Sequence, residues 1–281
     1  KTPTILEERH VSLERFMDDD RLVEIQPKLD GERLIAIHSP DQTLFLNRHA
    51  WTGDRASMPT LATGVAKLLN GDSAILDGEL VAKGGFYGQG GFLENRANRD
   101  GLTYVVFDLL DLNGEDLRTM PYIERLTRLL KYRCRTSPNL RLIPTATANQ
   151  PEAVRQAFRS TVKSGFEGLV IKPHDSLYVD NAWLKMKAKW TEDTQILGIR
   201  KTDGFKRTGV ASSWLINKGC VGSGLDWATR KRLTDILLRA KTGEDQEYVY
   251  IQPLITLEIE HNGDLGDSYR NPRIVKVRTD K

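Results

Sequence analysis

The sequence predicts a mixed α+β protein with two domains, which we expect over residues 1–190 and 191–281. Two observations support this prediction. Before Trp190, helical and strand periodicities are interspersed without the regular β-α-β alternation of a doubly wound sheet. After Trp190 the pattern changes to five short strand-like segments with one helix among them, which is typical of a small closed β-barrel such as an OB-fold.

The first domain begins with strand periodicity. Apolar residues alternate in parts of Leu22–Leu46, and the turn sequences Asp30-Gly31 and Ser39-Pro40-Asp41 divide this stretch. A helical stripe of apolar residues follows over Leu61–Leu69, and Gly71 is suited to ending that helix. Further strands are expected over residues 75–81, 103–110, 168–172 and 183–190, and helices over residues 121–133 and 151–164.

The second domain shows shorter periodic segments. Its strands are expected over residues 195–200, 213–217, 248–251, 256–260 and 273–277, and its helix over residues 226–240. The basic segment Lys201–Thr208 lies between the first two strands. We interpret it as a solvated loop or as a contact to DNA.

Composition excludes several classes of protein. Hydrophobic residues make up 39% of the 281 residues and charged residues 28%, as in a folded globular protein. No apolar run is long enough to cross a bilayer. Cys134 and Cys220 have neither a disulfide-framework nor a metal-ligand spacing. The net charge of +3 permits nucleic-acid binding, and without a signal peptide we expect a cytoplasmic protein.

Lys28 is the first candidate for a reactive group. It opens the segment Lys28–Arg33, in which Asp30-Gly31 is a turn dipeptide that can join two strands. Such a turn would bring Lys28 and Arg33 close together, and neighbouring cations lower each other's proton affinity. Because a lysine must lose its proton to act as a nucleophile, the segment predicts an activated lysine. The alternative is a charged surface hairpin.

A second candidate is the segment Trp183–Trp190. In a strand, Lys185, Lys187 and Lys189 lie on one face, with about 7 Å between neighbours. Three like charges in a row repel one another unless water or an anion covers them. A polyphosphate or a nucleic-acid backbone is a suitable anion. The alternative is a solvated edge strand that lysines protect from aggregation.

Two carboxylates stand beside glycines in strand-like segments. Glu79 follows Asp77-Gly78, and Glu167 precedes Gly168 and an apolar run. Carboxylate oxygens at such positions can hold Mg²⁺ or bind a ribose hydroxyl.

Taken in chain order, these segments resemble the covalent nucleotidyltransferase superfamily, and within it the ATP-dependent DNA ligases in a minimal two-domain form. The resemblance extends from about residue 22 to the end of the chain. The matching segments are Lys28–Arg33 (K-x-D-G-x-R), Leu46–Arg48, Asp77–Val81, Tyr104–Leu110, Glu167–Lys172, Trp183–Lys187 and Arg278–Lys281.

The resemblance implies a nucleotidyltransferase (adenylation) domain of antiparallel sheets with helices, followed by an OB-fold barrel. It implies that Lys28 attacks the α-phosphate of ATP to form a covalent lysyl-AMP. It also implies that Asp30, in the same motif, is a catalytic residue. Glu79 and Glu167 would contact the ribose or hold Mg²⁺ (or Mn²⁺). Phe107 would stack on the adenine.

Further roles implied by the resemblance concern phosphates and DNA. Arg33, Lys185 and Lys187 would neutralise the nucleotide phosphates. Arg48 would meet the 5′-phosphate of nicked duplex DNA, and the protein would act as a monomer without a membrane partner. The leaving pyrophosphate would be oriented by residues at the end of the chain, namely Arg278, Asp280 and Lys281.

One departure from the family pattern bears on the nucleotide. Gln26 stands two residues before Lys28, where many family members carry Glu, and this position influences base recognition. ATP remains the expected cofactor, with GTP as the competitor. The alternative functions are an RNA ligase, an mRNA-capping-type nucleotidyltransferase, or a non-catalytic nucleic-acid-binding protein of the OB type.

Overall fold

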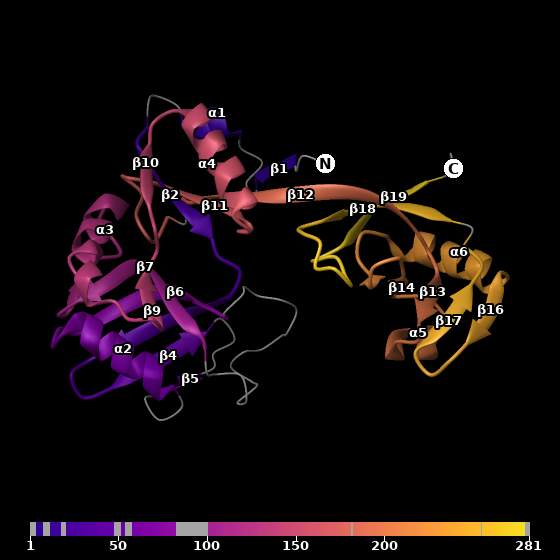
Figure 1. The fold of residues 1–281 in the computed structure, drawn as a ribbon, viewed down its shortest axis with the longest axis horizontal. Helices are drawn as coiled ribbons and strands as arrows, with labels where there is room; N and C mark the ends of the chain where they lie inside the picture. The colour runs from indigo at the N-terminus through magenta and orange to yellow at the C-terminus, as the bar shows by residue number, and fades with distance from the viewer. Residues whose placement is uncertain are drawn as a thin grey trace. The chain divides into compact units, whose positions relative to one another are not determined.

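The computed structural model describes residues 4–7, 12–17, 21–47, 52–53, 58–82, 101–180, 182–253 and 255–278. The chain divides into a larger unit, Glu7–Lys187, and a smaller unit, Lys1–Leu6 with Ala188–Lys281. Figure 1 follows the chain through both units. The expected domain boundary after residue 190 stays a prediction.

One sheet of the larger unit carries the end of the Lys28 strand. Its strands run in the antiparallel order β10 (Ala146–Ala148), β2 (Val23–Lys28), β11 (Gly168–Pro173) and the first part of β12 (Leu184–Gln195). Helix α4 (Pro151–Lys163) contacts β2, β10 and β11 (Figure 1). Its buried side chains are Val154 and Phe158.

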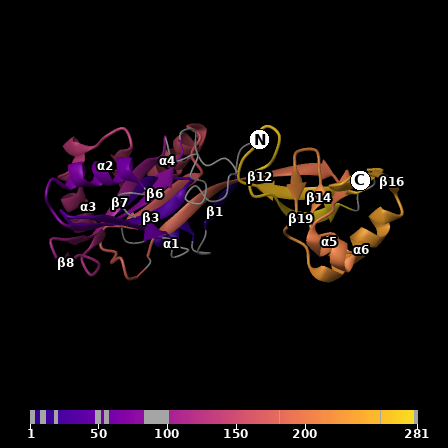
Figure 2. The ribbon, with the colours of Figure 1, turned by 90° about the horizontal axis from the view of Figure 1, so that it is seen from below.

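The other sheet of the larger unit has the order β5 (Thr52–Gly53), β4 (Thr43–Asn47), β3 (Glu32–His38), β6 (Ala74–Val81), β7 (Thr103–Leu112) and β8 (Glu115–Asp116). Strand β9 (Leu140–Leu142) pairs with β7 in parallel, whereas the other pairings among the described strands of this sheet are antiparallel. Helix α2 (Pro59–Leu69) packs on this sheet (Figure 2), and α3 (Tyr122–Leu130) contacts β7.

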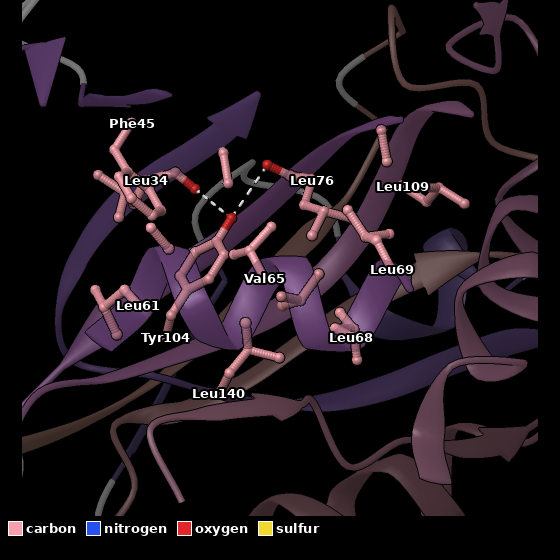
Figure 3. Close-up of a cluster of buried hydrophobic side chains, with 14 of the residues drawn as sticks. Leu34, Phe45, Leu61, Val65, Leu68, Leu69, Leu76, Tyr104, Leu109 and Leu140 are labelled. Atoms are coloured by element: carbon pink, nitrogen blue, oxygen red, sulfur yellow. Dashed lines mark hydrogen bonds between the residues drawn. The ribbon is translucent and has the colours of Figure 1, made fainter. Parts of the chain in front are cut away.

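Tyr104 organises the core between α2 and the second sheet (Figure 3). Its buried hydroxyl donates to the carbonyl oxygen of Leu34 at 2.9 Å and lies 3.1 Å from that of Leu76. A Cβ on Gly78 would lie 2.5 Å from the Tyr104 ring, so glycine is needed for this packing. The ring therefore fixes β6, which carries Asp77 and Glu79, against β3 and β7.

The segment after Lys28 does not form the expected hairpin. Strands β2 and β3 belong to different sheets, so the Asp30-Gly31 turn carries the chain from one sheet to the other. A Cβ on Gly31 would overlap the carbonyl oxygen of Leu80, which shows that the turn packs closely against β6. This packing, which depends on β6, overrides the local preference of Asp-Gly for a two-strand turn.

In the smaller unit, β12 continues and pairs with β18 (Thr256–His261), which pairs with β19 (Arg273–Arg278). A five-stranded sheet has the order β15 (Cys220–Val221), β14 (Trp214–Leu215), β13 (Gly198–Arg200), β17 (Tyr248–Ile251) and β16 (Lys241–Glu244). Buried residues of both strand sets and Leu237 of α6 (Trp227–Leu238) form one core. Among the described residues the strand order is open, so the expected closed barrel is not confirmed.

Most of the expected strands and helices are confirmed, with shifts at their ends. The basic segment Lys201–Thr208 differs from the expected loop, because α5 (Asp203–Thr208) forms there with Thr202 as its N-cap. Short elements without clear periodicity escaped prediction, including β1 (Thr4–Glu7), α1 (Leu13–Phe16) and the 3₁₀ turn Arg133–Arg135. No helix in the described part of the chain is long and apolar enough to cross a membrane.

Candidate active site

Lys28 ends β2, and a buried carboxylate holds its amine. Lys28 Nζ donates to Oε2 of Glu167 at 2.5 Å, and Lys187 Nζ lies 3.6 Å from Oε1 of the same carboxylate. The side chain of Glu167 is 5% exposed and that of Lys28 is 18% exposed. One carboxylate thus bridges two lysine amines at the edge of solvent.

Strand register explains this bridge. Gly168 pairs with Lys28 on β2 and with Lys187 on β12, so the three residues form one row across the sheet. Residues paired across strands share a face, and Gly168 places no side chain between the two lysines. A Cβ at Gly168 would overlap the carbonyl oxygen of Met186, so this strand spacing requires glycine.

Glu79 faces the turn that leaves Lys28. The backbone N–H of Gly31 hydrogen-bonds the Glu79 carboxylate, and the charges of Lys28 and Arg33 act on it. Burial nevertheless raises the pKa of Glu79 from 4.5 to about 7, because desolvation outweighs these cations. Glu79 can therefore gain or lose a proton near neutral pH.

Arg33 is anchored to β6 through Asp77. Its Nε and Nη2 atoms donate to the two oxygens of Asp77 at 3.0 and 2.7 Å. The hydrogen bond to Asp77 raises the pKa of Arg33, and burial raises the pKa of Asp77 against that bond. Each of the two cations therefore has its own carboxylate partner, in the ion pairs Lys28–Glu167 and Arg33–Asp77. The expected activation of Lys28 by Arg33 stays a prediction.

Lys172 has no role among the sequence-based expectations, yet it is 1% exposed and lies in the same sheet. Its Nζ atom donates to the carbonyl oxygen of Phe107 at 3.2 Å. The same atom lies 3.8 Å from the ring centre of Trp183, 4.5 Å from that of Phe107 and 4.6 Å from that of Tyr122. Burial lowers the pKa of Lys172 from 10.5 to about 7.

Gln26 joins this aromatic cluster. Its Nε2 atom donates to the Tyr122 hydroxyl at 2.6 Å, and that hydroxyl donates to the Phe107 carbonyl at 3.3 Å. The Phe107 carbonyl also accepts the bond from Lys172. Gln26 and Lys28 lie two residues apart on β2 and share one face. The lysine bridge and the aromatic cluster are thus parts of one site.

The remaining candidate residues are placed as follows. Lys185 is exposed on the same face of β12 as Lys187, which confirms the expected alternation. Asp30 lies in the turn between the sheets. Arg278 lies in the smaller unit and contacts Asp193 at 3.4 Å and Glu258 at 3.1 Å. Other candidates lie outside the described residues, namely Arg48, Asp280 and Lys281.

Several residues of the site carried little signal in the sequence. Asp77 and Lys172 lie in recognised segments, where a charge within or at the end of an apolar strand is the available clue. Tyr122 and Tyr178 gave no clue, because they reach the site from a helix and a loop. Among the described residues, no group of three or more His, Cys, Asp or Glu side chains could hold a metal ion.

The comparison with protein families decides the class of this chain. A family model described as the ATP dependent DNA ligase domain matches residues 5–187, which is more than half of the chain. The chain belongs to the ATP-dependent DNA ligase family. The matched range contains the lysine bridge and the aromatic cluster, whereas the candidates Arg278, Asp280 and Lys281 lie beyond it.

Relatives of this ligase-family chain extend beyond the matched domain. The DNA ligase of Thermococcus fumicolans is 27% identical over 293 residues, covering 90% of this chain and 51% of its own length. A probable DNA ligase of Rhodococcus opacus is 30% identical over 290 residues, covering 92% of this chain and 56% of its own length. The chain therefore spans about half the length of the curated ligases that it matches.

A solved ligase structure supports the fold. Mycobacterial DNA ligase D, complexed with ATP and MES, is similar with a TM-score of 0.53 and 24% identity, covering 92% of this chain and 90% of its own. At this identity the likeness shows a shared fold, and the ligase-type arrangement of antiparallel sheets and helices is thereby confirmed.

Proposed function

We propose that this chain is an ATP-dependent DNA ligase that seals nicks in duplex DNA through a covalent lysyl-AMP at Lys28. The observation that carries the proposal is the buried bridge Lys28–Glu167–Lys187 inside the matched ligase domain. It brings together an amine, a proton acceptor and a second cation. These are the groups that phosphoryl transfer to an amine requires.

The first step forms a bond between Lys28 Nζ and the α-phosphorus of ATP, and the bond from that phosphorus to pyrophosphate breaks. Lys28 must lose a proton, and the Glu167 carboxylate at 2.5 Å is positioned to receive it. AMP then passes to the 5′-phosphate at a nick. Finally, the 3′-hydroxyl attacks that phosphate and AMP leaves.

The cations are proposed to position phosphates. Lys187, Lys185 and Arg33 would neutralise the nucleotide's phosphate oxygens, because negative charge must be gathered at one point for this reaction. The same proposal covers Arg48 at the 5′-phosphate. In the same proposal, the leaving pyrophosphate is oriented by Arg278, Asp280 and Lys281.

ATP is the proposed nucleotide. The ring of Phe107 offers a face for adenine. Gln26 is linked to Phe107 through the Tyr122 hydroxyl, which accepts a hydrogen bond from Gln26 and donates one to the Phe107 carbonyl. The fold is shared with a ligase whose solved structure contains ATP.

Mg²⁺ (or Mn²⁺) is part of the proposal. Such ions are commonly held by one or two carboxylates together with substrate phosphates, and Glu79 and Glu167 are carboxylates of that kind. When bound, the ion would neutralise phosphate charge. Glu167 is engaged by two lysines, so Glu79 is the better of the two ligands in this arrangement.

We further propose that the smaller unit is an OB-type barrel. The bridge between Ser223 and Arg273 supports this, because it joins the chain after β15 to β19. The two strand sets also share one core. The whole protein is proposed to act as a monomer on nicked duplex DNA.

The test is labelling with ATP that carries ³²P at the α-phosphate. The wild-type chain with Mg²⁺ should retain the label through denaturation, and Lys28→Ala should not. The matched control is Lys218→Ala, which removes an ion-paired lysine of the smaller unit (its partner is Asp264) and should label normally. Label retained by Lys28→Ala would overturn the assignment of the nucleophile.

Substrate class is tested separately. The chain should seal a nick in duplex DNA faster than a nick in RNA or in a mixed duplex. Preferential sealing of RNA would favour the RNA-ligase alternative, and transfer of GMP to an RNA end would favour a capping enzyme. A chain that takes no label and only binds nucleic acid would be a non-catalytic binder.

A further inference from the structure

The hydroxyl of Tyr178 closes a ring of hydrogen bonds with Arg33 and Asp77. Arg33 Nη2 donates to the Tyr178 oxygen at 2.5 Å, and the Tyr178 hydroxyl donates to Oδ2 of Asp77 at 2.9 Å. Asp77 is fully buried, whereas the Arg33 side chain is 50% exposed. Tyr178 therefore stabilises the junction between a buried carboxylate and a guanidinium that reaches solvent.

The hydrogen bonds among Arg33, Asp77 and Tyr178 leave one edge of the guanidinium available to a ligand. Arginine has five N–H donors, of which Nε provides one and Nη2 provides two. These three donors serve Asp77 and Tyr178. In the part of the chain that the structure describes, the two N–H groups of Nη1 have no acceptor. Asp77 and Tyr178 together thus fix which edge of Arg33 can meet a ligand.

Tyr178 is itself held by the aromatic cluster. Its ring lies edge-on to that of Trp183, with 6.1 Å between centres and 76° between planes. Trp183 also contacts Phe107 and lies over the amine of Lys172. Through its N–H, Tyr178 bonds the carbonyl oxygen of Arg118. Tyr178 is therefore held at its ring by Trp183 and at its backbone by Arg118, so its hydroxyl has little freedom to follow a moving Arg33.

Arg33 lies beside the site of the proposed reaction. It pairs in register with Glu79 on β6, and its charge, like that of Lys28, acts on the Glu79 carboxylate. An oriented Nη1 edge at this place suits an anionic oxygen of a phosphate, because guanidinium N–H groups bind such oxygens in pairs.

We propose that Tyr178 is a positioning residue that orients Arg33 so that its Nη1 edge meets a phosphate oxygen of the bound nucleotide. This inference rests on the proposed function. Loss of the hydroxyl would leave the Arg33–Asp77 pair in place but would remove the partner of one Nη2 hydrogen and of one carboxylate lone pair. The guanidinium would then sample other orientations.

Tyr178→Phe tests this role, because it removes the hydroxyl and keeps the ring. We expect the rate of self-adenylation at saturating ATP to fall about tenfold, the usual effect of losing a hydrogen bond to a charged group. The KM for ATP should change less than about twofold, since Arg33 keeps its charge. The matched control is Tyr132→Phe, which removes a tyrosine hydroxyl bonded to Asp72 at 2.7 Å elsewhere in the larger unit.

A double-mutant cycle separates positioning from a general structural effect. In an Arg33→Lys background the guanidinium edges are absent, so adding Tyr178→Phe should lower the rate by less than about twofold. An equal tenfold loss in both backgrounds would overturn the inference, as would an unchanged rate in Tyr178→Phe alone. A wild-type chain that takes no label would overturn the proposed function itself, which is a distinguishable result.

Discussion

The amine of Lys28 and the carboxylate of Glu167 are joined by a 2.5 Å hydrogen bond, although 139 positions separate the two residues in the chain. Adjacent strands bring them together, and Lys187 contacts the other carboxylate oxygen. The carboxylate is almost fully buried, so its interactions with both lysines are weakly screened.

Glu167→Gln should lower the rate of self-adenylation by about 10²-fold, because an amide cannot accept the proton that Lys28 must lose. The rate is measured in a single turnover at saturating labelled ATP. The control is Glu260→Gln, which removes the partner of Lys189 at 2.8 Å in the smaller unit and should keep the wild-type rate. A Glu167→Gln variant as fast as wild type would refute the role of this carboxylate as proton acceptor.

Glu79→Gln should remove a pH dependence of stability. The folded carboxyl has a pKa of about 7 against 4.5 when unfolded, so the folded chain binds more protons between these values. Wild-type stability should therefore fall as pH rises from about 4.5 to about 7, by on the order of 3 kcal/mol for this group. The variant should lack that fall.

The measurement is urea unfolding of both chains at pH 4.5, 6 and 8, with the difference in unfolding free energy plotted against pH. The variant should gain relative to wild type as pH rises through this window. A difference that stays constant with pH would contradict the raised pKa of Glu79.

Lys172→Met should alter stability in a different pH window. The folded amine has a pKa of about 7 against 10.5 when unfolded, so the unfolded chain binds more protons between these values. Because of this group, the unfolding free energy of the wild type should rise as pH increases from about 7 to about 10.5. The variant should lose that rise, and it should be most favoured relative to wild type near pH 7.

Urea unfolding at pH 7, 8 and 9.5 measures this effect. The control is Lys131→Met, which changes an exposed lysine and should leave the pH profile unaltered. If Lys172→Met and wild type showed parallel pH profiles, the amine of Lys172 would be charged throughout that range.

Gly168→Ala should destabilise the larger unit by more than about 3 kcal/mol, because the new Cβ would overlap the Met186 carbonyl and push β11 away from β12. It should also abolish adenylation, since Glu167 could no longer reach both lysines. Thermal unfolding and labelling measure the two effects. Gly243→Ala is the control, because a Cβ there meets nothing within 4 Å. Normal stability and labelling in Gly168→Ala would show that the strand spacing is adjustable.

Much of the fold could be predicted because its signals are local. Alternating apolar residues predicted β2, β3 and β4, and the apolar run at Thr103–Leu112 predicted β7. The turn Asp30-Gly31 was predicted as a hairpin and is instead a crossing between sheets, because strand pairing depends on partners far away in sequence. The short strands β15 and β16 gave no periodic signal to predict them from.

For the site, the sequence alone determined which residues are available: a lysine before Asp30-Gly31, carboxylates beside Gly78 and Gly168, and lysines alternating along β12. Only the tertiary structure decided how they pair. In the folded chain Lys28 pairs with Glu167, Arg33 pairs with Asp77, and Lys172 is buried among aromatic rings. The physical reason is that charge pairing and desolvation depend on distances across strands, and those distances exist only after the sheets have formed.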